Sequence, residues 1–390
     1  MLISNSGRRP IVQIDEDHSP AHAGITAVVS QLSGYLASQG VPTTILTAGE
    51  GSMPTAAGVD LVKFPLGRFG RRWRYPVGMK AYLEEVARTP GIIFHLHGPW
   101  CAPQWLAGLT AKRFQVPALL SPHSALEPWF WQYSSLRWLR YQAYWRILAY
   151  PVFRHLAIIH AITATERDNL ARLFPGQRLE LIRNAINLAE ADEALTTANS
   201  ELTMETKCRY LLFLGQLHPK KGIDILIKSF SQVCESRDIR LLIVGPDKFL
   251  QYSSYLKSLV TELGLASRGR FMGPIYGPKK WQLYRNAWAV CFPSYSEVIG
   301  LVNLEAAAAS TPVVTSYHTG LLDWEEGGGI LIYPRVEDLT RALQQVLSWS
   351  DSERQDRGRQ LRQLVESRYS WEVVGPQWSN LYADLLEKCI

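Results

Sequence analysis

Cysteine and long apolar segments are scarce in this chain of 390 residues. The five cysteines stand at positions 101, 208, 234, 291 and 389, without a Cys-x-x-Cys pair. An odd number at such wide spacing argues against a disulfide framework or a zinc site, and it suits a reducing cytoplasm. The best apolar stretch, residues 141–159, is interrupted by Arg146 and Arg154, and the first ten residues are polar. We therefore expect a cytoplasmic protein with neither a membrane-spanning helix nor a signal peptide.

The motifs of several binding classes are missing as well. There is no Gly-x-Gly-x-x-Gly, which argues against a dinucleotide-dependent oxidoreductase, a class that would also alternate strands and helices. There is no helix-turn-helix, zinc-finger or RNP pattern, so we expect no nucleic-acid partner. His95 and His97 would share one face of a strand and could together bind a metal, but the sequence near them lacks the further ligands that such a site would need. We expect no metal site and no cofactor.

What the chain does contain is a large apolar fraction, 47%, arranged in short runs. Strand-like runs fall at residues 11–14, 43–47, 61–63, 92–96, 118–120, 158–162 and 179–182, and again at 210–214, 240–244, 271, 289–292, 312–315 and 330–333. Helical segments separate them, and this alternation predicts an α/β protein with parallel sheets covered on both faces. The length and the polar stretch 189–207, read as a linker, indicate two domains.

Two carboxylates eight residues apart, Glu297 and Glu305, give the strongest functional signal. They follow a buried strand, with Glu297 in a loop and Glu305 about one turn into a helix. Gly300 at the start of that helix leaves backbone N–H groups accessible, and such groups favour an anion. Because carboxylates accept hydrogen bonds from hydroxyls, the segment predicts a ligand that joins a polyol to a phosphate. The alternative is a pair of unrelated surface glutamates.

Short motifs follow one another over residues 208–335: Gly215-x-Leu217, Lys221-Gly222, Val244-Gly245, Gly273-Pro-Ile-Tyr276, Pro293-Ser294, Glu297-x7-Glu305 and Thr311-Pro-Val-Val. In this order they resemble the motifs of the retaining glycosyltransferases of family four, which have the GT-B architecture. The resemblance implies two Rossmann-like parallel-sheet domains facing each other across a cleft, with the ligand outside the carboxyl ends of the strands. We expect an acceptor-side domain over 1–190 and a nucleotide-sugar domain over 208–370. A last helix, 371–388, either packs back on the first domain or closes the second.

The same resemblance implies roles on the donor side. Lys221 stands where the family's lysine contacts the diphosphate, with Lys220 as a second cation; the alternative is a solvated lysine pair. Gln216 replaces the usual arginine and brings no charge. Glu305 would bind the ribose hydroxyls, and Glu297 would bind hydroxyls of the transferred sugar as a catalytic residue.

Backbone groups complete the implied donor site. The N–H groups of Leu301 and Val302, after Gly300, would bind the phosphates. Ile275 would flank the base. Gly24 stands near the reacting centre in the first strand–helix loop, where relatives have Gly-Gly and this chain has Ala23 before it.

Two histidines carry the resemblance in the first half. His97, in a His-Gly step, would lie beside the sugar as a catalytic residue; the alternative is a structural histidine. His123 matches a Pro-His-Gly step on the acceptor side, although Ser124 replaces the glycine.

The implied function is transfer of a hexose from a nucleotide-diphosphate sugar to a hydroxyl of a saccharide or lipid-linked saccharide, with retention and without a metal. Bacterial surface-polysaccharide biosynthesis is the implied setting. Two alternatives stay open: a metal-dependent glycosyltransferase of the other common fold, using Asp15 and Asp17, and a degenerate, non-catalytic GT-B protein that binds nucleotide or glycan.

The chain is basic, with a formal net charge of +6. Arginine and aromatic residues concentrate over 68–75 and 129–154, a composition that suits peripheral contact with anionic lipid at the inner face of a membrane. Trp138, Tyr141, Trp145 and Leu148 follow helical spacing, which favours a packed core for much of this segment. A plain soluble surface is the alternative to membrane contact.

Overall fold

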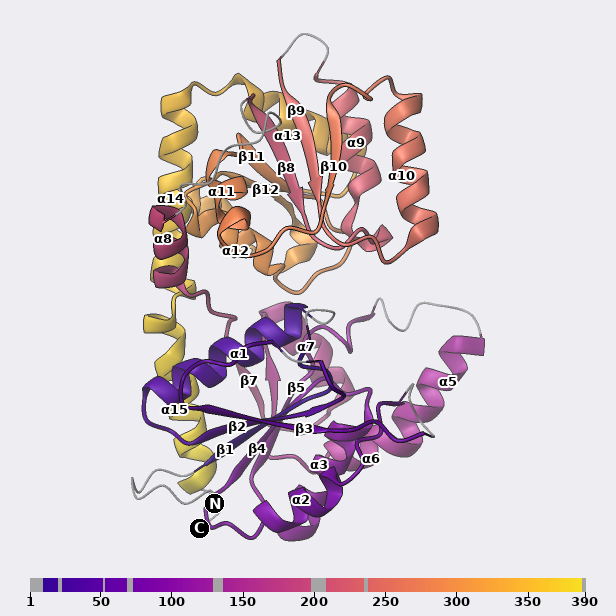
Figure 1. The fold of residues 1–390 in the computed structure, drawn as a ribbon, viewed down its shortest axis with the longest axis vertical. Coiled ribbons are helices and arrows are strands. Elements are labelled where there is room, and N and C mark those ends of the chain that lie inside the picture. The colour runs from indigo at the N-terminus through magenta and orange to yellow at the C-terminus, as the bar shows by residue number, and fades with distance from the viewer. Residues whose placement is uncertain are drawn as a thin grey trace. The chain divides into compact units, whose positions relative to one another are not determined.

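The computed structural model describes residues 10–19, 23–51, 53–68, 73–128, 136–197, 208–234 and 238–387. The chain forms two compact units (Figure 1). Unit 1 comprises Met1–Ala185 and Trp371–Ile390, and unit 2 comprises Ile186–Ser370. Each is an α/β unit built on one parallel sheet, so the predicted fold class is confirmed.

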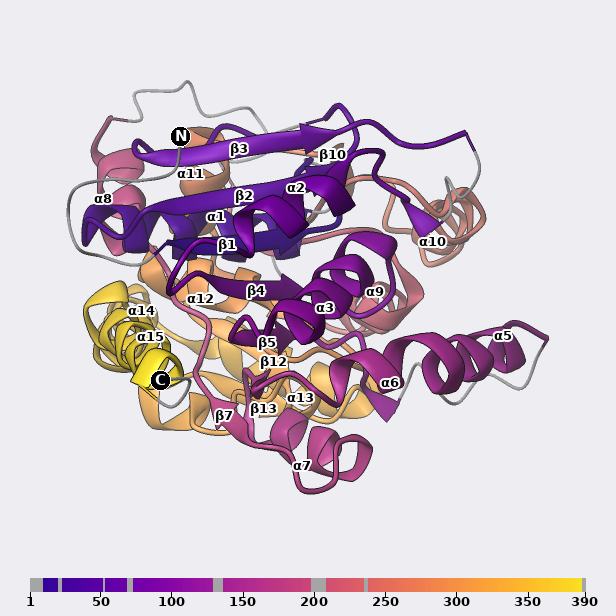
Figure 2. The ribbon, with the colours of Figure 1, turned by 90° about the horizontal axis from the view of Figure 1, so that it is seen from below.

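Unit 1 contains a seven-stranded parallel sheet in the order β3-β2-β1-β4-β5-β6-β7. Its strands are β1 (Ile11–Asp15), β2 (Thr43–Ala48), β3 (Val59–Phe64), β4 (Ile93–His97), β5 (Ala118–Ser121), β6 (Ile158–Ala161) and β7 (Leu179–Leu181). Figure 2 shows β3, β2, β1, β4 and β5 side by side in this order. The central strands are buried on both faces, as parallel strands between two helical layers must be.

Helices cover both faces of this sheet. They are α1 (Ala23–Ser38), α2 (Met79–Val86), α3 (Ala102–Phe114), α5 (Leu136–Tyr144), the π-helix η3 (Trp145–Ala149), α6 (Tyr150–Phe153), α7 (Ala164–Leu173) and α15 (Trp371–Glu387). Side chains of α2, α3 and α6 pack with Val12, Phe94 and Leu120 on one face. Side chains of α1 and α15 pack with Ile11 and Ile93 on the other.

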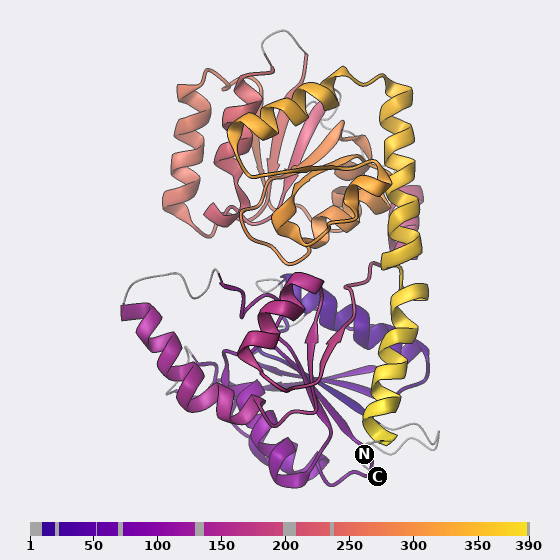
Figure 3. The ribbon, with the colours of Figure 1, turned by 180° about the vertical axis from the view of Figure 1, so that it is seen from behind.

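The last helix, α15, belongs to unit 1 although its sequence follows unit 2. Its apolar stripe packs into the sheet's second core, where Trp378, Leu381 and Leu385 are buried. Trp371 stacks on Tyr35 of α1, with 5.2 Å between ring centroids. Figure 3 shows α15, in yellow, beside the sheet of unit 1. The helix thus covers the face of the sheet from which Gln13, His95 and His97 project.

Unit 2 contains a six-stranded parallel sheet in the order β10-β9-β8-β11-β12-β13. Its strands are β8 (Tyr210–Leu214), β9 (Arg240–Val244), β10 (Gly269–Gly273), β11 (Ala289–Phe292), β12 (Val313–Ser316) and β13 (Ile330–Ile332). Its longer helices are α8 (Leu188–Thr197), α9 (Ile223–Ser231), α10 (Leu250–Glu262), α11 (Pro278–Asn286), α12 (Leu301–Ala308), α13 (Val336–Ser348) and α14 (Asp351–Tyr369). Short 3-10 turns are η5 (Pro219–Lys221), η6 (Tyr317–Thr319) and η7 (Trp324–Gly327).

The linker prediction for 189–207 was wrong in its first half. Residues there form α8, which packs on α11 and α12 within unit 2. Ala191 and Ala194, one helical turn apart, are buried, and Asp192 pairs with Arg362 of α14. The alanines that suggested a featureless linker instead allow α8 to approach its neighbours closely. Residues 198–207 lie outside the described part of the chain.

Candidate active site

The predicted donor residues gather at the point where the strand order of unit 2 reverses. Strand β8 pairs with β9 on one side and with β11 on the other. The loops that leave β8 and β11 therefore emerge side by side at the carboxyl ends of neighbouring parallel strands. In open α/β sheets this switch point is where ligands bind. Lys221 lies on the first loop, and Glu297 lies on the second.

Lys221 and Glu297 form an ion pair, and their side chains are only 14% and 13% exposed. The ammonium group also lies 4.8 Å from the centroid of the Phe292 ring. Burial lowers the pKa of Lys221 from its ordinary value. Burial opposes ionisation of Glu297 too, but the attraction of Lys221 and Lys220 outweighs it and holds the pKa of that carboxyl below its ordinary value. The pair is therefore charged, in a largely desolvated place where electrostatic interactions are strong.

A second pair involves Glu305. Lys280 Nζ lies 2.8 Å from one carboxylate oxygen, and the Tyr284 hydroxyl donates to the other at 2.7 Å. The lysine and glutamate side chains are 21% and 20% exposed. We call Lys221, Glu297, Lys280 and Glu305 the lysine–glutamate site. Lys280 and Tyr284 escaped the sequence analysis, although their spacing of four places them on one face of α11.

Close backbone contact holds the two loops of this site together. The Lys220 carbonyl accepts hydrogen bonds from the Tyr295 N–H at 2.8 Å and the Ser294 hydroxyl at 2.9 Å. Gly222 has φ +67°, and a Cβ there would lie 2.2 Å from the Pro293 carbonyl oxygen. Only glycine fits at that position, so the Lys-Gly step is required by packing as well as by chemistry.

The remaining predicted donor residues lie around these two pairs. Gly300 precedes α12 with φ 59°, and Leu301 and Val302 occupy the first turn of that helix, half-buried. Gln216 is the second residue after the end of β8, and Ile275 lies in the loop between β10 and α11. Gly24, by contrast, is an exposed residue in the first turn of α1 in unit 1.

In unit 1 four histidines converge under α15; we call His95, His97, His123 and His160 the histidine cluster. His97 is fully buried, and both of its ring nitrogens have partners, His123 Nε2 at 2.8 Å and Gln13 Oε1 at 2.7 Å. His123 is only half-buried. Burial lowers the pKa of every member, that of His123 to about 3 and that of His160 to about 4.

The loop that carries His123 has an unusual backbone. His123 and Ser124 have φ 52° and 64°, in the left-handed region that favours glycine. The glycine that the family resemblance implies at the position of Ser124 would adopt this conformation without strain. The Glu166 carboxylate accepts the Ser124 N–H at 2.9 Å and the Ile162 N–H at 2.8 Å. Burial raises the pKa of Glu166 to about 7.

The acidic pair proposed for a metal-dependent alternative is engaged elsewhere. Asp15 is fully buried and lies 3.0 Å from His18 Nδ1. Asp17 pairs with Arg74 at 3.2 Å. Among the residues that the structure describes, no group of three or more His, Cys, Asp or Glu is arranged to hold a metal ion.

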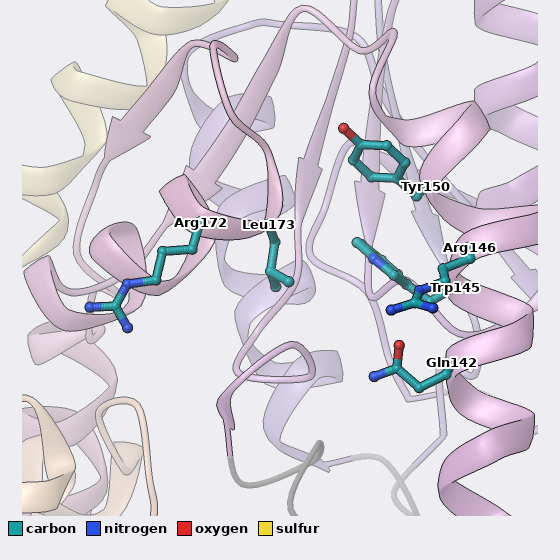
Figure 4. Close-up of a pocket in the computed structure, with 6 residues that line it drawn as sticks. All are labelled: Gln142, Trp145, Arg146, Tyr150, Arg172 and Leu173. Carbon is teal, nitrogen blue, oxygen red and sulfur yellow. The ribbon is translucent and has the colours of Figure 1, made fainter.

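A cavity of about 440 Å³ opens elsewhere on unit 1, between the α5–α6 segment and the end of α7. It is lined by Gln142, Trp145, Arg146, Tyr150, Arg172 and Leu173. Figure 4 shows four of these side chains projecting from one helical segment, with Leu173 opposite them and the Arg172 guanidinium turned away. None of the predicted site residues lines this cavity. None of the helices in the described ranges is both long and apolar enough to span a bilayer.

Comparison with known proteins identifies the family. Residues 22–190 match the family model described as Glycosyltransferase Family 4, and residues 197–363 match Glycosyl transferases group 1. An uncharacterized glycosyltransferase of Methanocaldococcus jannaschii is 31% identical over 237 residues, 58% of this chain and 60% of that protein. The D-inositol 3-phosphate glycosyltransferase of Corynebacterium aurimucosum is 29% identical over 226 residues, 56% of this chain and 52% of that protein. The match thus spans about half to three fifths of these two relatives. The enzyme of the same name from Frankia alni is 28% identical, with 83% of this chain and 86% of that protein covered.

Solved structures show the same fold. Sucrose-phosphate synthase from Thermosynechococcus elongatus superposes with a TM-score of 0.79 at 23% identity, covering 98% of this chain and 100% of that one. The Anabaena protein HepE, in complex with UDP and glucose, superposes with a TM-score of 0.73 at 15% identity, covering 97% of this chain and 100% of that one. The chain belongs to the family-four glycosyltransferases of GT-B architecture.

Proposed function

We propose that this protein is a retaining hexosyltransferase. It would transfer a hexose from a nucleotide-diphosphate sugar to a hydroxyl of a saccharide or lipid-linked saccharide. The observation that carries the proposal is the lysine–glutamate site at the switch point of unit 2, because it combines cations for a diphosphate with carboxylates for hydroxyls. Relatives named as D-inositol 3-phosphate glycosyltransferases and the UDP and glucose bound to HepE support this ligand class.

Each side chain then has a defined task. As the glycosidic bond breaks, negative charge grows on the diphosphate, and Lys221 and the first N–H groups of α12 stabilise that charge. Glu305 binds the ribose hydroxyls and is held in place by Lys280 and Tyr284. Glu297 binds hydroxyls of the departing sugar. Attack occurs on the front face, with the leaving phosphate accepting the acceptor's proton, so no side chain serves as a covalent nucleophile and no metal is required.

Two alanine variants test these assignments. Glu305→Ala removes a charged hydrogen-bond partner worth roughly 1.5–3 kcal/mol, so nucleotide binding should weaken about ten- to a hundredfold. Glu297→Ala should leave binding of the bare nucleotide diphosphate intact, because it frees Lys221, while turnover collapses. Thermal shift with nucleotide diphosphates, UDP among them, and a transfer assay read the two effects.

The control is Glu262→Ala, an exposed glutamate at the end of α10, which should change neither measurement. Equal loss of nucleotide binding in the Glu297 and Glu305 variants would show the roles to be misassigned. Binding without transfer to any saccharide acceptor would favour a non-catalytic binding protein, the function that Gln216 in place of arginine permits. Activity lost with chelator and restored by manganese would contradict the metal-independent mechanism.

We also propose that the protein acts in the cytoplasm, peripherally at the inner membrane face. Leu139 and Ile147 are 55% and 70% exposed on the α5–α6 segment, beside Arg140 and Arg146. No Asp or Glu occurs between Glu127 and Glu166. Such a surface suits anionic lipid. Ile147→Glu should abolish co-sedimentation with anionic vesicles, whereas Leu263→Glu, a matched change on the exposed end of α10, should not. Equal binding of both variants would refute this location.

A further inference from the structure

A continuous hydrogen-bonded chain runs through the interior of unit 1 and ends at His123. It begins at the Ile182 carbonyl, which lies 2.8 Å from His160 Nε2, and continues from His160 Nδ1 to Ser121 Oγ (2.8 Å) and from Ser121 Oγ to His95 Nε2 (2.7 Å). His95 Nδ1 lies 2.8 Å from the Tyr382 hydroxyl, which lies 3.4 Å from Gln13 Nε2. Gln13 Oε1 lies 2.7 Å from His97 Nε2, and His97 Nδ1 lies 2.8 Å from His123 Nε2. All members except His123 are buried. The residues of this hydrogen-bonded chain come mostly from four strands and from α15.

The histidines of this chain are neutral at pH 7, because burial depresses the pKa of all four. A neutral imidazole has one N–H donor and one bare nitrogen that accepts. Every link in the chain must therefore pair one donor with one acceptor. Once the direction of a single link is known, the directions of all the others follow.

The Ile182 carbonyl settles the first link, because a carbonyl can only accept. His160 must carry its proton on Nε2, which leaves Nδ1 as an acceptor for the Ser121 hydroxyl. Having donated its only proton, Ser121 accepts from His95, so His95 also carries its proton on Nε2. The bare Nδ1 of His95 then accepts from the Tyr382 hydroxyl.

The second half of the chain follows in the same way. The Tyr382 oxygen, having donated its proton, accepts from the Gln13 amide nitrogen, and this orients Gln13 with its oxygen toward His97. His97 therefore donates from Nε2 and accepts at Nδ1. His123 donates its Nε2 proton to His97. His123 Nδ1 is left without a proton, and no described residue bonds to it.

We propose that Gln13 and Tyr382 are positioning residues that set the tautomers of His97 and His123, so that His123 presents a bare Nδ1 to a hydroxyl of the acceptor saccharide. This rests on the proposed transferase function. The half-buried position of His123 at the end of an otherwise buried chain makes it the member that a ligand reaches. Its left-handed backbone and that of Ser124, held by Glu166, are the kind of local strain that persists at functional sites. The last helix thereby contributes to the acceptor side through Tyr382.

The tautomers can be read directly by NMR of the full chain labelled with ¹⁵N-histidine, with signals assigned by single His→Asn variants. In the wild type His95, His97, His123 and His160 should all carry the proton on Nε2. Gln13→Met removes the acceptor for His97, which should then donate from Nδ1 and leave His123 protonated on Nδ1. Gln13→Glu keeps an acceptor at this position and should retain the wild-type tautomers.

Gln104→Met is the matched control. Gln104 is also fully buried, and it donates to the His97 backbone carbonyl at 2.7 Å, outside the chain. This variant should leave all four tautomers unchanged. Should Gln13→Met fail to fold, Tyr382→Phe removes only the hydroxyl that orients Gln13; His97 and His123 should then show both tautomers while His160 stays as it was.

Kinetics separate positioning from structure. Gln13→Met should lower kcat/KM for the acceptor about tenfold and leave nucleotide binding unchanged. Gln13→Glu should restore kcat/KM for the acceptor. A wild-type His123 protonated on Nδ1, or Gln13→Met with wild-type tautomers, would overturn the proposal. So would unchanged acceptor kinetics in an active Gln13→Met enzyme. Since the NMR experiment needs no substrate, predicted tautomers in a chain that transfers no sugar would locate the failure in the proposed function.

Discussion

The lysine–glutamate site of unit 2 and the histidine cluster of unit 1 provide partners for their buried polar groups in opposite ways. The first uses full charges in compensating pairs, each side chain 13–21% exposed. The second uses neutral groups, nearly all fully buried, joined end to end. Paired charges can exchange partners when a charged ligand arrives. A neutral chain with fixed donor directions holds its geometry and cannot reverse one link alone.

The backbones differ in the same regions. The lysine–glutamate site places glycine at its left-handed positions, Gly222 and Gly300. The histidine-cluster loop places His123 and Ser124 there instead. The lysine–glutamate site therefore avoids backbone strain at these positions, whereas the loop of His123 carries larger residues in the left-handed region. Four predictions test this contrast.

The largest effect is expected at the charged site. In the proposed mechanism Lys221→Ala removes the cation that stabilises the leaving group, and turnover should then fall about a hundred- to a thousandfold. The control is Lys228→Ala on α9, a 41% exposed lysine whose ammonium group lies 4.0 Å from Asp224, which should cost less than twofold. Steady-state transfer assays on both variants measure the difference. A loss below threefold for Lys221→Ala would mean that this cation does not stabilise the transition state.

The histidine cluster should instead make the free energy of unfolding depend on pH. Its histidines have depressed pKa values when folded, so below pH 6.5 the unfolded chain binds more protons and stability falls as the pH falls toward 4. Each histidine contributes roughly 1.4 kcal/mol per pH unit in that window. Glu166, whose pKa is raised to about 7 by burial, and Glu127, whose pKa burial also raises, act with the opposite sign but are outnumbered by the four histidines. The free energy of unfolding should therefore decrease from pH 6.5 to 4.5.

Denaturant unfolding at several pH values measures this slope. His160→Asn should reduce it by roughly 1.4 kcal/mol per pH unit, because one titrating group is gone. Ser121→Ala breaks the same hydrogen-bonded chain without removing a titrating group and should keep the slope. If His160→Asn kept the full slope as well, the acid sensitivity would have another origin.

A smaller effect is expected from removing a glycine in unit 2. At Gly300, with φ 59°, a Cβ would lie 3.0 Å from Phe292 and from Asn303. Gly300→Ala should cost about 1–2 kcal/mol for the left-handed backbone, plus a further amount for crowding. The control is Gly176→Ala, because Gly176 also has a left-handed φ, +77°, but has open space around it. The difference between the two variants' midpoints of thermal unfolding therefore measures the crowding at Gly300. Equal midpoints would show that the loop yields freely.

The smallest effect is expected from the reverse change in unit 1, in which a glycine is introduced at a left-handed position. Ser124→Gly relieves a left-handed serine, and the gain is partly offset by the greater freedom of glycine in the unfolded chain. We expect a stabilisation of up to about 1 kcal/mol, measured by chemical unfolding. Ala125→Gly, at the next position and outside the left-handed region, should destabilise instead. A destabilised Ser124→Gly variant would argue that the backbone there is unstrained.

Much of this architecture follows from local pattern. Every predicted strand is present, because a short apolar run bounded by polar segments suits a strand of a parallel sheet that is covered on both faces. The spacing of Glu297 and Glu305 placed one residue in a loop and the other on α12. The linker prediction failed at α8 because small residues at helical spacing look the same whether they face solvent or a neighbouring helix. Only the packing of Ala191 against unit 2 distinguishes the two cases.

The pairing of side chains depended on tertiary structure. Nothing near Glu305 in sequence marks Lys280 and Tyr284 as its partners, and Tyr382 stands 287 residues from His95. Sequence spacing specifies which face of a helix or strand a residue occupies, because that depends only on local backbone geometry. Which groups meet across the core depends on how distant elements pack. For that reason Lys221, Glu297 and Glu305 of one site and His97 and His123 of the other could be named in advance. Lys280, His160, the ion pairs and the direction of the hydrogen-bonded chain could not.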